Sequence, residues 1–266
     1  MAEDSVTLIG GIRQNLLAIQ RASAARGVAE RNLSTGRRVN SAADDAVAYF
    51  QAKALSDRTT DLAGIKSSIN QAVSTLGAAS DGVRGVGRLL DQLKGLALAA
   101  RGADESGRAE LARQFNDLRG QVDLLARDAG YQGVNLLSTQ SAELRVEFET
   151  GDLTVAPRDV SAAGLGVAAA NVSTFDFEAA LGQVEAATSQ VRSIEQALNS
   201  SLGALTTRGD YTASVMNTLK AGEDKLTLAD AGEEAARLVS IRTRRQLGMT
   251  ALAIANDSQR SLLALF

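Results

Sequence analysis

Two adjacent carboxylates, Asp44 and Asp45, are the residues of this chain that most resemble a catalytic pair. General acid and base catalysis by two carboxyl groups needs side chains that converge on one substrate. Neighbouring residues at the start of a helix point about 100° apart around its axis, so these two side chains diverge. We therefore interpret Ser41 as the cap of the next helix, and Asp44 and Asp45 as charges that suit the positive end of its dipole.

Two other patterns resemble nucleotide sites only in part. The run Ser34-Thr35-Gly36-Arg37 lacks the spaced glycines and the lysine of a phosphate cradle, and no strand precedes the glycines at 82, 85 and 87. The sequence has no histidine and no cysteine. Both the commonest general base near neutral pH and all thiolate chemistry are therefore missing. We predict that the protein is not an enzyme and has no cofactor or metal site.

The overall composition points to long helices rather than to a large globular core. Aromatic residues make up 3% of the chain, and Pro157 is the single proline. The net charge of −3 offers no basic field for nucleic acid. No segment of about 20 apolar residues could span a bilayer, and the acidic start Met1-Ala2-Glu3-Asp4 is unlike a cleaved signal peptide.

An unbroken heptad pattern between Leu62 and Ala100 is the main structural signal. A spacing that alternates three and four residues predicts a long helix with one narrow apolar seam for a partner helix. A second seam with the same average spacing runs from Leu181 to Leu219 and is the expected partner. Six glycines inside the first segment would each cost about 1 kcal/mol relative to alanine. Either close packing against another subunit compensates, or the helix breaks near Gly82 to Gly87.

The segment between the two seams changes period. Leu111, Phe115, Leu118, Val122 and Leu125 predict a shorter helix that folds back. Alternating residues from Leu144 to Val155, with Thr150-Gly151-Asp152 between them, predict a β-hairpin with one apolar face. Ser173 or Thr174 is expected to cap the returning helix, which should end near Ala221 to Lys225.

Each end of the chain carries a further amphipathic helix with a narrow apolar stripe. The stripes, with the two apolar residues at the C-terminus, contain Ile12, Leu16, Ile19, Leu33, Leu247, Ile254, Leu262, Leu265 and Phe266. A helix with so little to bury is marginal alone in water and needs a neighbour.

Two motifs carry a family resemblance. Leu33-Ser34-Thr35-Gly36-Arg37-Arg38-Val39-Asn40, followed by Ala43-Asp44-Asp45-Ala46, closely resembles the N-terminal signature of bacterial flagellins. Thr243-Arg244-Arg245-Gln246-Leu247-Gly248 and the residues around it are similar to the C-terminal signature. The chain is thus identified as a short member of the flagellin family that lacks the variable outer domains.

The resemblance implies a mainly α fold of long antiparallel, coiled-coil-like helical rods with a central β-hairpin. It implies an inner, D0-like domain of residues 1–41 and 226–266 and a D1-like rod domain of residues 42–225, with the hairpin at about 131–160. The connector residues Arg37, Arg38, Asn40, Asp44 and Asp45 would position the inner helices or, in the simpler interpretation, only cap a helix.

The resemblance also implies function and partners. The protein would assemble with copies of itself into the extracellular flagellar filament for swimming motility, after export without a cleaved signal peptide. The apolar stripes of the two terminal helices, with Leu265 and Phe266, would be the assembly interface. Its partners would be the flagellar cap, the hook-filament junction proteins, an export chaperone and the type III flagellar export apparatus. Gln92, Lys94 and Gly95 replace residues that the vertebrate innate receptor for flagellin recognises, so we expect weak or absent activation of that receptor.

Two alternatives remain at this point. A hook-filament junction protein shares both terminal signatures. A coiled-coil signalling rod of a chemoreceptor shares the alanine-rich heptads, but such a rod has no central hairpin and usually follows transmembrane helices.

Overall fold

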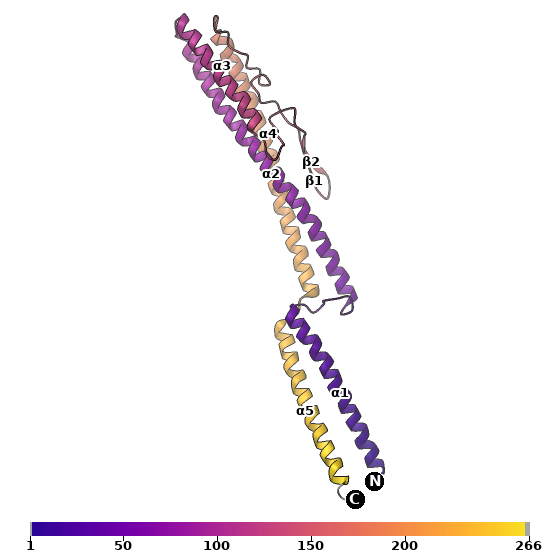
Figure 1. Cartoon of the computed structure of the whole chain (residues 1–266). Helices are drawn as coiled ribbons and strands as arrows, with labels where there is room; N and C mark the ends of the chain where they lie inside the picture. The colour runs from indigo at the N-terminus through magenta and orange to yellow at the C-terminus, as the bar shows by residue number, and fades with distance from the viewer. Residues whose placement is uncertain (1, 264–266) are drawn as a thin grey trace. The chain divides into compact units, whose positions relative to one another are not determined.

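The computed structural model describes residues 2–263, with side chains from residue 11 to 258 and at 260 and 261. The chain forms α1 (Ala2–Thr35), α2 (Ala46–Arg101), α3 (Glu105–Asp128), β1 (Leu144–Glu147), β2 (Asp152–Val155), α4 (Phe177–Thr227) and α5 (Ala231–Leu263) (Figure 1). The predicted mainly α fold with a central hairpin is confirmed. The described residues fall into two compact units, Met1–Thr59 with Asn217–Phe266, and Thr60–Met216. These divisions lie inside α2 and α4, and the D0-like and D1-like boundaries at 41/42 and 225/226 stay a prediction.

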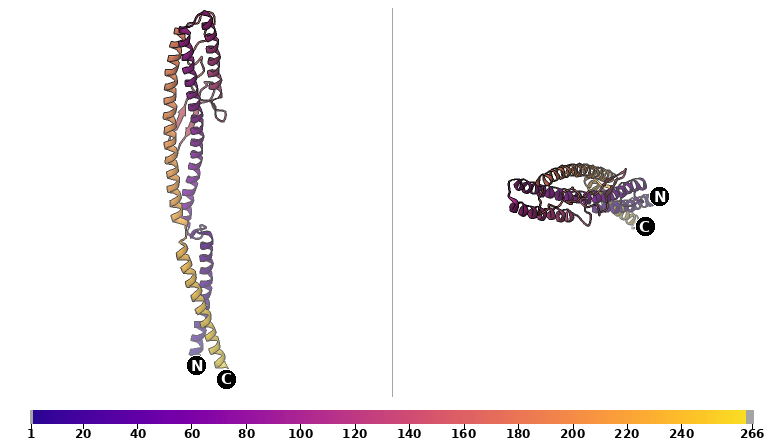
Figure 2. Two further views of the ribbon diagram at one scale, coloured as in Figure 1. Left: turned by 90° about the vertical axis from the view of Figure 1, so that its left-hand side faces the viewer. Right: turned by 90° about the horizontal axis from the view of Figure 1, so that it is seen from above.

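The unit Thr60–Met216, called here the rod unit, packs α2, α3 and α4 side by side with the hairpin laid against them (Figure 2). Both predicted seams are confirmed, because every residue of the first heptad pattern from Leu62 to Ala100 is buried except Ile65, which is half-buried. The second seam places Val184, Val191, Leu198 and Leu205 in the same core. Phe115 and Val122 of α3 are fully buried there too.

The glycines of α2 do not break the helix, which is continuous from Ala46 to Arg101. A Cβ added at Gly82 would overlap the Cβ of Ala129 and lie 2.8 Å from Leu137 Cδ1, and one at Gly85 would lie 2.6 Å from Leu125 Cδ2. Close approach therefore does explain these two glycines, but the neighbours are α3 and the chain that follows it rather than another subunit. Gly64, Gly77 and Gly95 meet nothing within 4 Å.

The hairpin has the predicted alternation and turn. Leu144 pairs with Val155 and Val146 with Leu153 in antiparallel register, and this apolar face packs on the core. Gly151 adopts a φ of 86°, which a residue with a side chain rarely adopts. The Arg208 guanidinium of α4 lies 4.8 Å from the Phe148 ring centroid and adds a cation–π contact at the hairpin tip.

The chain after the hairpin is fixed to α3 by polar contacts. Arg119 Nε donates to the Val167 carbonyl at 2.8 Å, and the Asn116 amide exchanges two hydrogen bonds with the backbone of Ala170. The cap of α4 is Asp176, whose Oδ1 accepts from the Ala179 N–H at 3.0 Å. The prediction of Ser173 or Thr174 as this cap was wrong, since Asp176 stands nearer to the first helical turn.

The unit Met1–Thr59 with Asn217–Phe266, called here the terminal unit, contains α1 and α5 as an antiparallel pair (Figure 1). The start of α1 and the end of α5 therefore lie at the same end of this pair. The helix α4 continues to Thr227, so the interruption before α5 is at Leu228 to Asp230 rather than at Ala221 to Lys225 as expected.

The glycine packing generates a stability prediction. Gly82→Ala should destabilise the rod unit by about 1 to 3 kcal/mol, because the backbone-anchored Cβ of Ala129 cannot move away without shifting α3. The matched control Gly64→Ala, in open space on the same helix, should stabilise it by up to about 1 kcal/mol. Urea unfolding followed by circular dichroism measures both, and equal effects of the two changes would contradict the packing argument.

Candidate assembly surface and connector

One side of α5 packs against α1. The residues of this inward side are buried or half-buried and recur at steps of four and three: Glu234, Leu238, Ile241, Arg245, Gly248, Leu252 and Ala255. The helices approach closely at Gly248, whose carbonyl accepts a hydrogen bond from Asn15 Nδ2 at 3.1 Å. A Cβ at Gly248 would lie 3.0 Å from Ile19 Cγ1. This contact is specific, but only Glu234, Leu238 and Ile241 of these seven residues are buried rather than half-buried.

The opposite side of α5 is apolar and exposed. Leu247, Ile254 and Val239 are 65%, 63% and 63% exposed. At about 100° per residue these three fall within a sector of about 80°, roughly opposite the inward side. Leu247 and Ile254 belong to the predicted stripe, and the structure places both away from α1. Val239 was not predicted, because the predicted stripe of this helix begins at Leu247.

The predicted residues of α1 divide between the two environments. Ile12, Ile19 and Leu33 are half-buried, whereas Leu16 is 49% exposed. Leu265 and Phe266 lie outside the described residues, as does the side chain of Leu262.

Exposed apolar side chains are concentrated in the terminal unit. Among the described side chains, ten of the thirteen exposed large hydrophobic residues belong to it. They include Val47 and Phe50 at the start of α2, which are 68% and 62% exposed and were not predicted. Both precede the predicted heptad pattern, which begins at Leu62, and no sequence signal indicated their exposure. Such a concentration is typical of a surface that binds another protein.

The connector between α1 and α2 is bonded to the end of α4 and to the residues that follow it. The Arg38 N–H donates to the Thr227 carbonyl at 2.7 Å, and the Ala229 N–H donates to the Gly36 carbonyl at 3.0 Å. The side chain of Arg38 reaches the Leu226 carbonyl at 3.2 Å. Arg37 Nη2 lies 3.5 Å from Glu223 Oε1. Arg37 and Arg38 therefore join two segments that are far apart in the sequence.

The remaining connector residues organise the turn before α2. Asp44 Oδ2 accepts from the backbone N–H groups of Asn40 and Ser41 and from the Ser41 hydroxyl, at 3.1, 2.9 and 3.0 Å. These hydrogen bonds, chiefly the one from the Asn40 backbone, lower the pKa of Asp44 below its ordinary value. Asn40 Nδ2 donates to the Arg37 carbonyl at 3.0 Å. Asp45 is the cap of α2, since its Oδ1 accepts from the Ala48 N–H at 3.0 Å, so the prediction of Ser41 as this cap was wrong.

The predicted receptor region lies on α2 in the rod unit. Gln92 and Gly95 are exposed, and Lys94 Nζ forms an ion pair of 2.9 Å with Glu185 Oε1 of α4. The positive charge of Lys94 is therefore paired with a carboxylate of the same chain.

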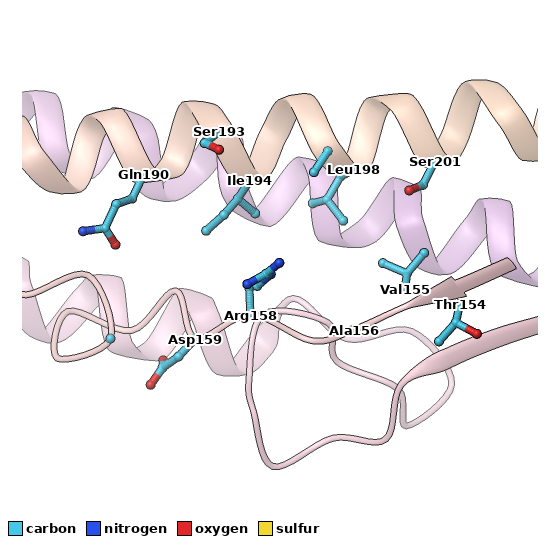
Figure 3. Close-up of a pocket in the computed structure, with 12 residues that line it drawn as sticks. Thr154, Val155, Ala156, Arg158, Asp159, Gln190, Ser193, Ile194, Leu198 and Ser201 are labelled. Atoms are coloured by element: carbon cyan, nitrogen blue, oxygen red, sulfur yellow. The ribbon is translucent and has the colours of Figure 1, made fainter.

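A groove of about 560 Å³ lies between α4 and the segment from β2 to Gly164 (Figure 3). Its lining mixes Ile194 and Leu198 with polar residues, and Figure 3 shows Arg158 directed toward α4. The described residues contain no cluster of acidic side chains suited to a metal ion. Within residues 2–263, no helix combines the length and hydropathy needed to cross a membrane.

Comparison with known proteins gives consistent matches. Residues 10–142 match the family model of the bacterial flagellin N-terminal helical region, and residues 177–266 match that of the bacterial flagellin C-terminal helical region. The chain is 28% identical to flagellin FljK of Caulobacter vibrioides over 274 residues, covering 100% of both chains. It is 21% identical to a flagellin of Brucella melitensis over 255 residues, covering 89% of this chain and 90% of that one. The crystal structure of Bacillus cereus flagellin aligns with 54% of this chain and 86% of its own at 15% identity, with a TM-score of 0.49.

The lowered pKa of Asp44 generates a pH prediction. A carboxylate whose folded pKa is depressed stabilises its loop above its ordinary pKa, and this contribution is lost as the pH falls through the folded value. The amide signals of Asn40 and Ser41 in NMR spectra should therefore shift in acid toward those of a loop without these hydrogen bonds. In Asp44→Asn, which cannot titrate, the same signals should not change over that range. A transition of equal size in both proteins would contradict the assignment.

Proposed function

The chain belongs to the bacterial flagellin family, and on that premise we propose that the exposed apolar side of α5 is the surface through which its copies assemble into the flagellar filament. Members of this family are structural proteins that polymerise, and the relatives named above are flagellins, which favours a filament subunit over a hook-filament junction protein. The single observation that carries the proposal is the exposed sector containing Val239, Leu247 and Ile254 on the side of α5 opposite α1.

The physical argument is that one partner helix cannot bury all the apolar side chains of α5. Two helices can bury one side of each other, so a helix with apolar residues on two sides needs a further partner. Burial of apolar surface is worth about 25 cal/mol per Å². A head-to-tail contact between identical subunits that does not close into a ring extends into a helical fibre. The stripes of α1 and α5 supply such a contact once several copies are present.

The other members of the proposed interface are the remaining residues of the predicted stripes. Ile12, Leu16, Ile19 and Leu33 would contribute from α1, and Leu262, Leu265 and Phe266 from the end of the chain. The connector residues Arg37, Arg38, Asn40, Asp44 and Asp45 would hold the two terminal helices in the arrangement that the filament requires.

Further partners and location are also part of the proposal. The subunit would be exported through the type III flagellar apparatus with an export chaperone and without a cleaved signal peptide. It would meet the hook-filament junction proteins at the base of the filament and the cap at its tip. The residues Gln92, Lys94 and Gly95 would make it a weak ligand of the vertebrate flagellin receptor.

Seeded elongation tests the assembly surface. The double change Leu247→Ser and Ile254→Ser should slow elongation from preformed filament seeds by about tenfold or more, because each buried aliphatic side chain contributes about 1.5 to 3 kcal/mol. Light scattering gives the rate, and electron microscopy verifies the fibres. Ala253→Ser on the same helix, where little apolar area is removed, is the matched control. Elongation of the double variant at the control rate would refute the proposal.

Charge reversal tests the connector. Arg37→Glu would place two carboxylates opposite each other and should impair polymerisation or change the filament shape. The helicity of the free subunit should stay the same, and its stability should change by no more than about 1 kcal/mol, since the ion pair is partly exposed. The exchanged pair Arg37→Glu with Glu223→Arg should restore assembly. Unchanged filaments from Arg37→Glu would mean that the connector only caps a helix.

A further inference from the structure

Glu234 is a carboxylate buried in the contact between α1 and α5. It is 6% exposed, and its Oε1 accepts a hydrogen bond of 2.9 Å from Nδ2 of Asn32, which is 3% exposed. Arg237 Nη1 lies 3.8 Å from the same oxygen. The second oxygen, Oε2, is buried and has no hydrogen-bond partner among the described residues.

This arrangement is poor as a source of stability. Burying a carboxylate costs hydration free energy, and an oxygen left without a donor does not recover it. Two apolar side chains of similar size would fill the same space at least as well. Polar residues kept at a helix contact have a different and well-attested use, which is to fix the alignment of the helices.

The buried apolar side chain of α1 gives little information about alignment. Between residues 11 and 35, Ala29 and Asn32 are the only described buried side chains of α1. Sliding α1 by seven residues puts Ala22 in the place of Ala29, an exchange of alanine for alanine. The same slide puts Ala25 in the place of Asn32 and removes the donor to Glu234. The polar pair therefore distinguishes two alignments that the alanines do not.

The rotation of α5 has the same ambiguity. Its inward side offers Leu238, Ile241 and Leu252, and its outward side offers Val239, Leu247 and Ile254, so each side could be buried. Glu234 projects near the middle of the inward side, at about 100° per residue. It is also the first side chain of α5 that is buried, directly after the segment bonded to the connector.

We propose that the Asn32–Glu234 hydrogen bond selects the register and rotation of α5 on α1, and thereby which side of α5 is offered to another copy of the chain. The inference rests on the proposed function for its consequence in assembly. Its structural part, the choice of alignment within one chain, can be measured separately.

The decisive variants keep the volume or the chemistry of the pair. In the full chain, Asn32→Leu with Glu234→Leu removes the polar selection and leaves an apolar contact. The exchanged pair Asn32→Glu with Glu234→Asn keeps one donor and one carboxylate at the same level. Because the chain contains no cysteine, Ile19→Cys with Gly248→Cys can report the alignment in each background through disulfide yield.

In the double leucine variant we expect helicity like that of the parent, but disulfide yield and seeded elongation rate each reduced by about tenfold, as several alignments become populated. The exchanged pair should restore both to within about threefold of the parent. Parental disulfide yield and elongation in the double leucine variant would overturn the inference, as would an exchanged pair as deficient as the leucine pair. If the parent forms the disulfide but never elongates from seeds, the proposed function fails, and the disulfide yields still decide the choice of alignment.

Discussion

The structure depends on narrow apolar seams between antiparallel helices, built largely from alanine, valine and leucine. In the rod unit, α2 is covered by α4, by α3 and by the hairpin, so residues such as Leu76 and Leu90 are completely buried. Among the described residues of the terminal unit, α1 and α5 pack mainly against each other. Two helices cannot cover more than one side of each, and the uncovered side carries Leu247 and Ile254. The same type of seam therefore produces a closed core in one unit and an open one in the other.

This difference links stability to assembly. A seam of small side chains removes little apolar area from water, and isolated helix pairs of that kind are marginal. In the proposed filament, the terminal helices complete their burial against other copies, so their order and the growth of the fibre would be coupled. The rod unit does not depend on other copies for its burial, because its core is formed within one chain. In this proposal the terminal helices become fully ordered only when the subunit polymerises.

The elements were predictable where one periodic signal acts alone. The seam from Leu62 to Ala100 and the alternation around Val146 each specify a period and a buried side, and both are confirmed. Prediction failed where several neighbouring residues could cap the same helix. Ser173, Thr174 and Asp176 can all cap a helix, and Ser41, Asp44 and Asp45 compete in the same way, so only the backbone geometry selects Asp176 and Asp45. The pair of Asn32 and Glu234 was missed because 202 residues separate them, and no local pattern connects them.

The glycines of α2 show why the isolated chain is not optimised for its own stability. Gly82 and Gly85 let α3 and the following chain approach, so the close packing offsets their low helix propensity. Gly64, Gly77 and Gly95 meet no atom within 4 Å, yet each still costs about 1 kcal/mol relative to alanine. At these three positions no close approach of a described neighbour accounts for that cost. It is consistent with a subunit whose helices are selected for contacts between chains as well as within one, since a residue without a side chain lets a neighbouring backbone come close.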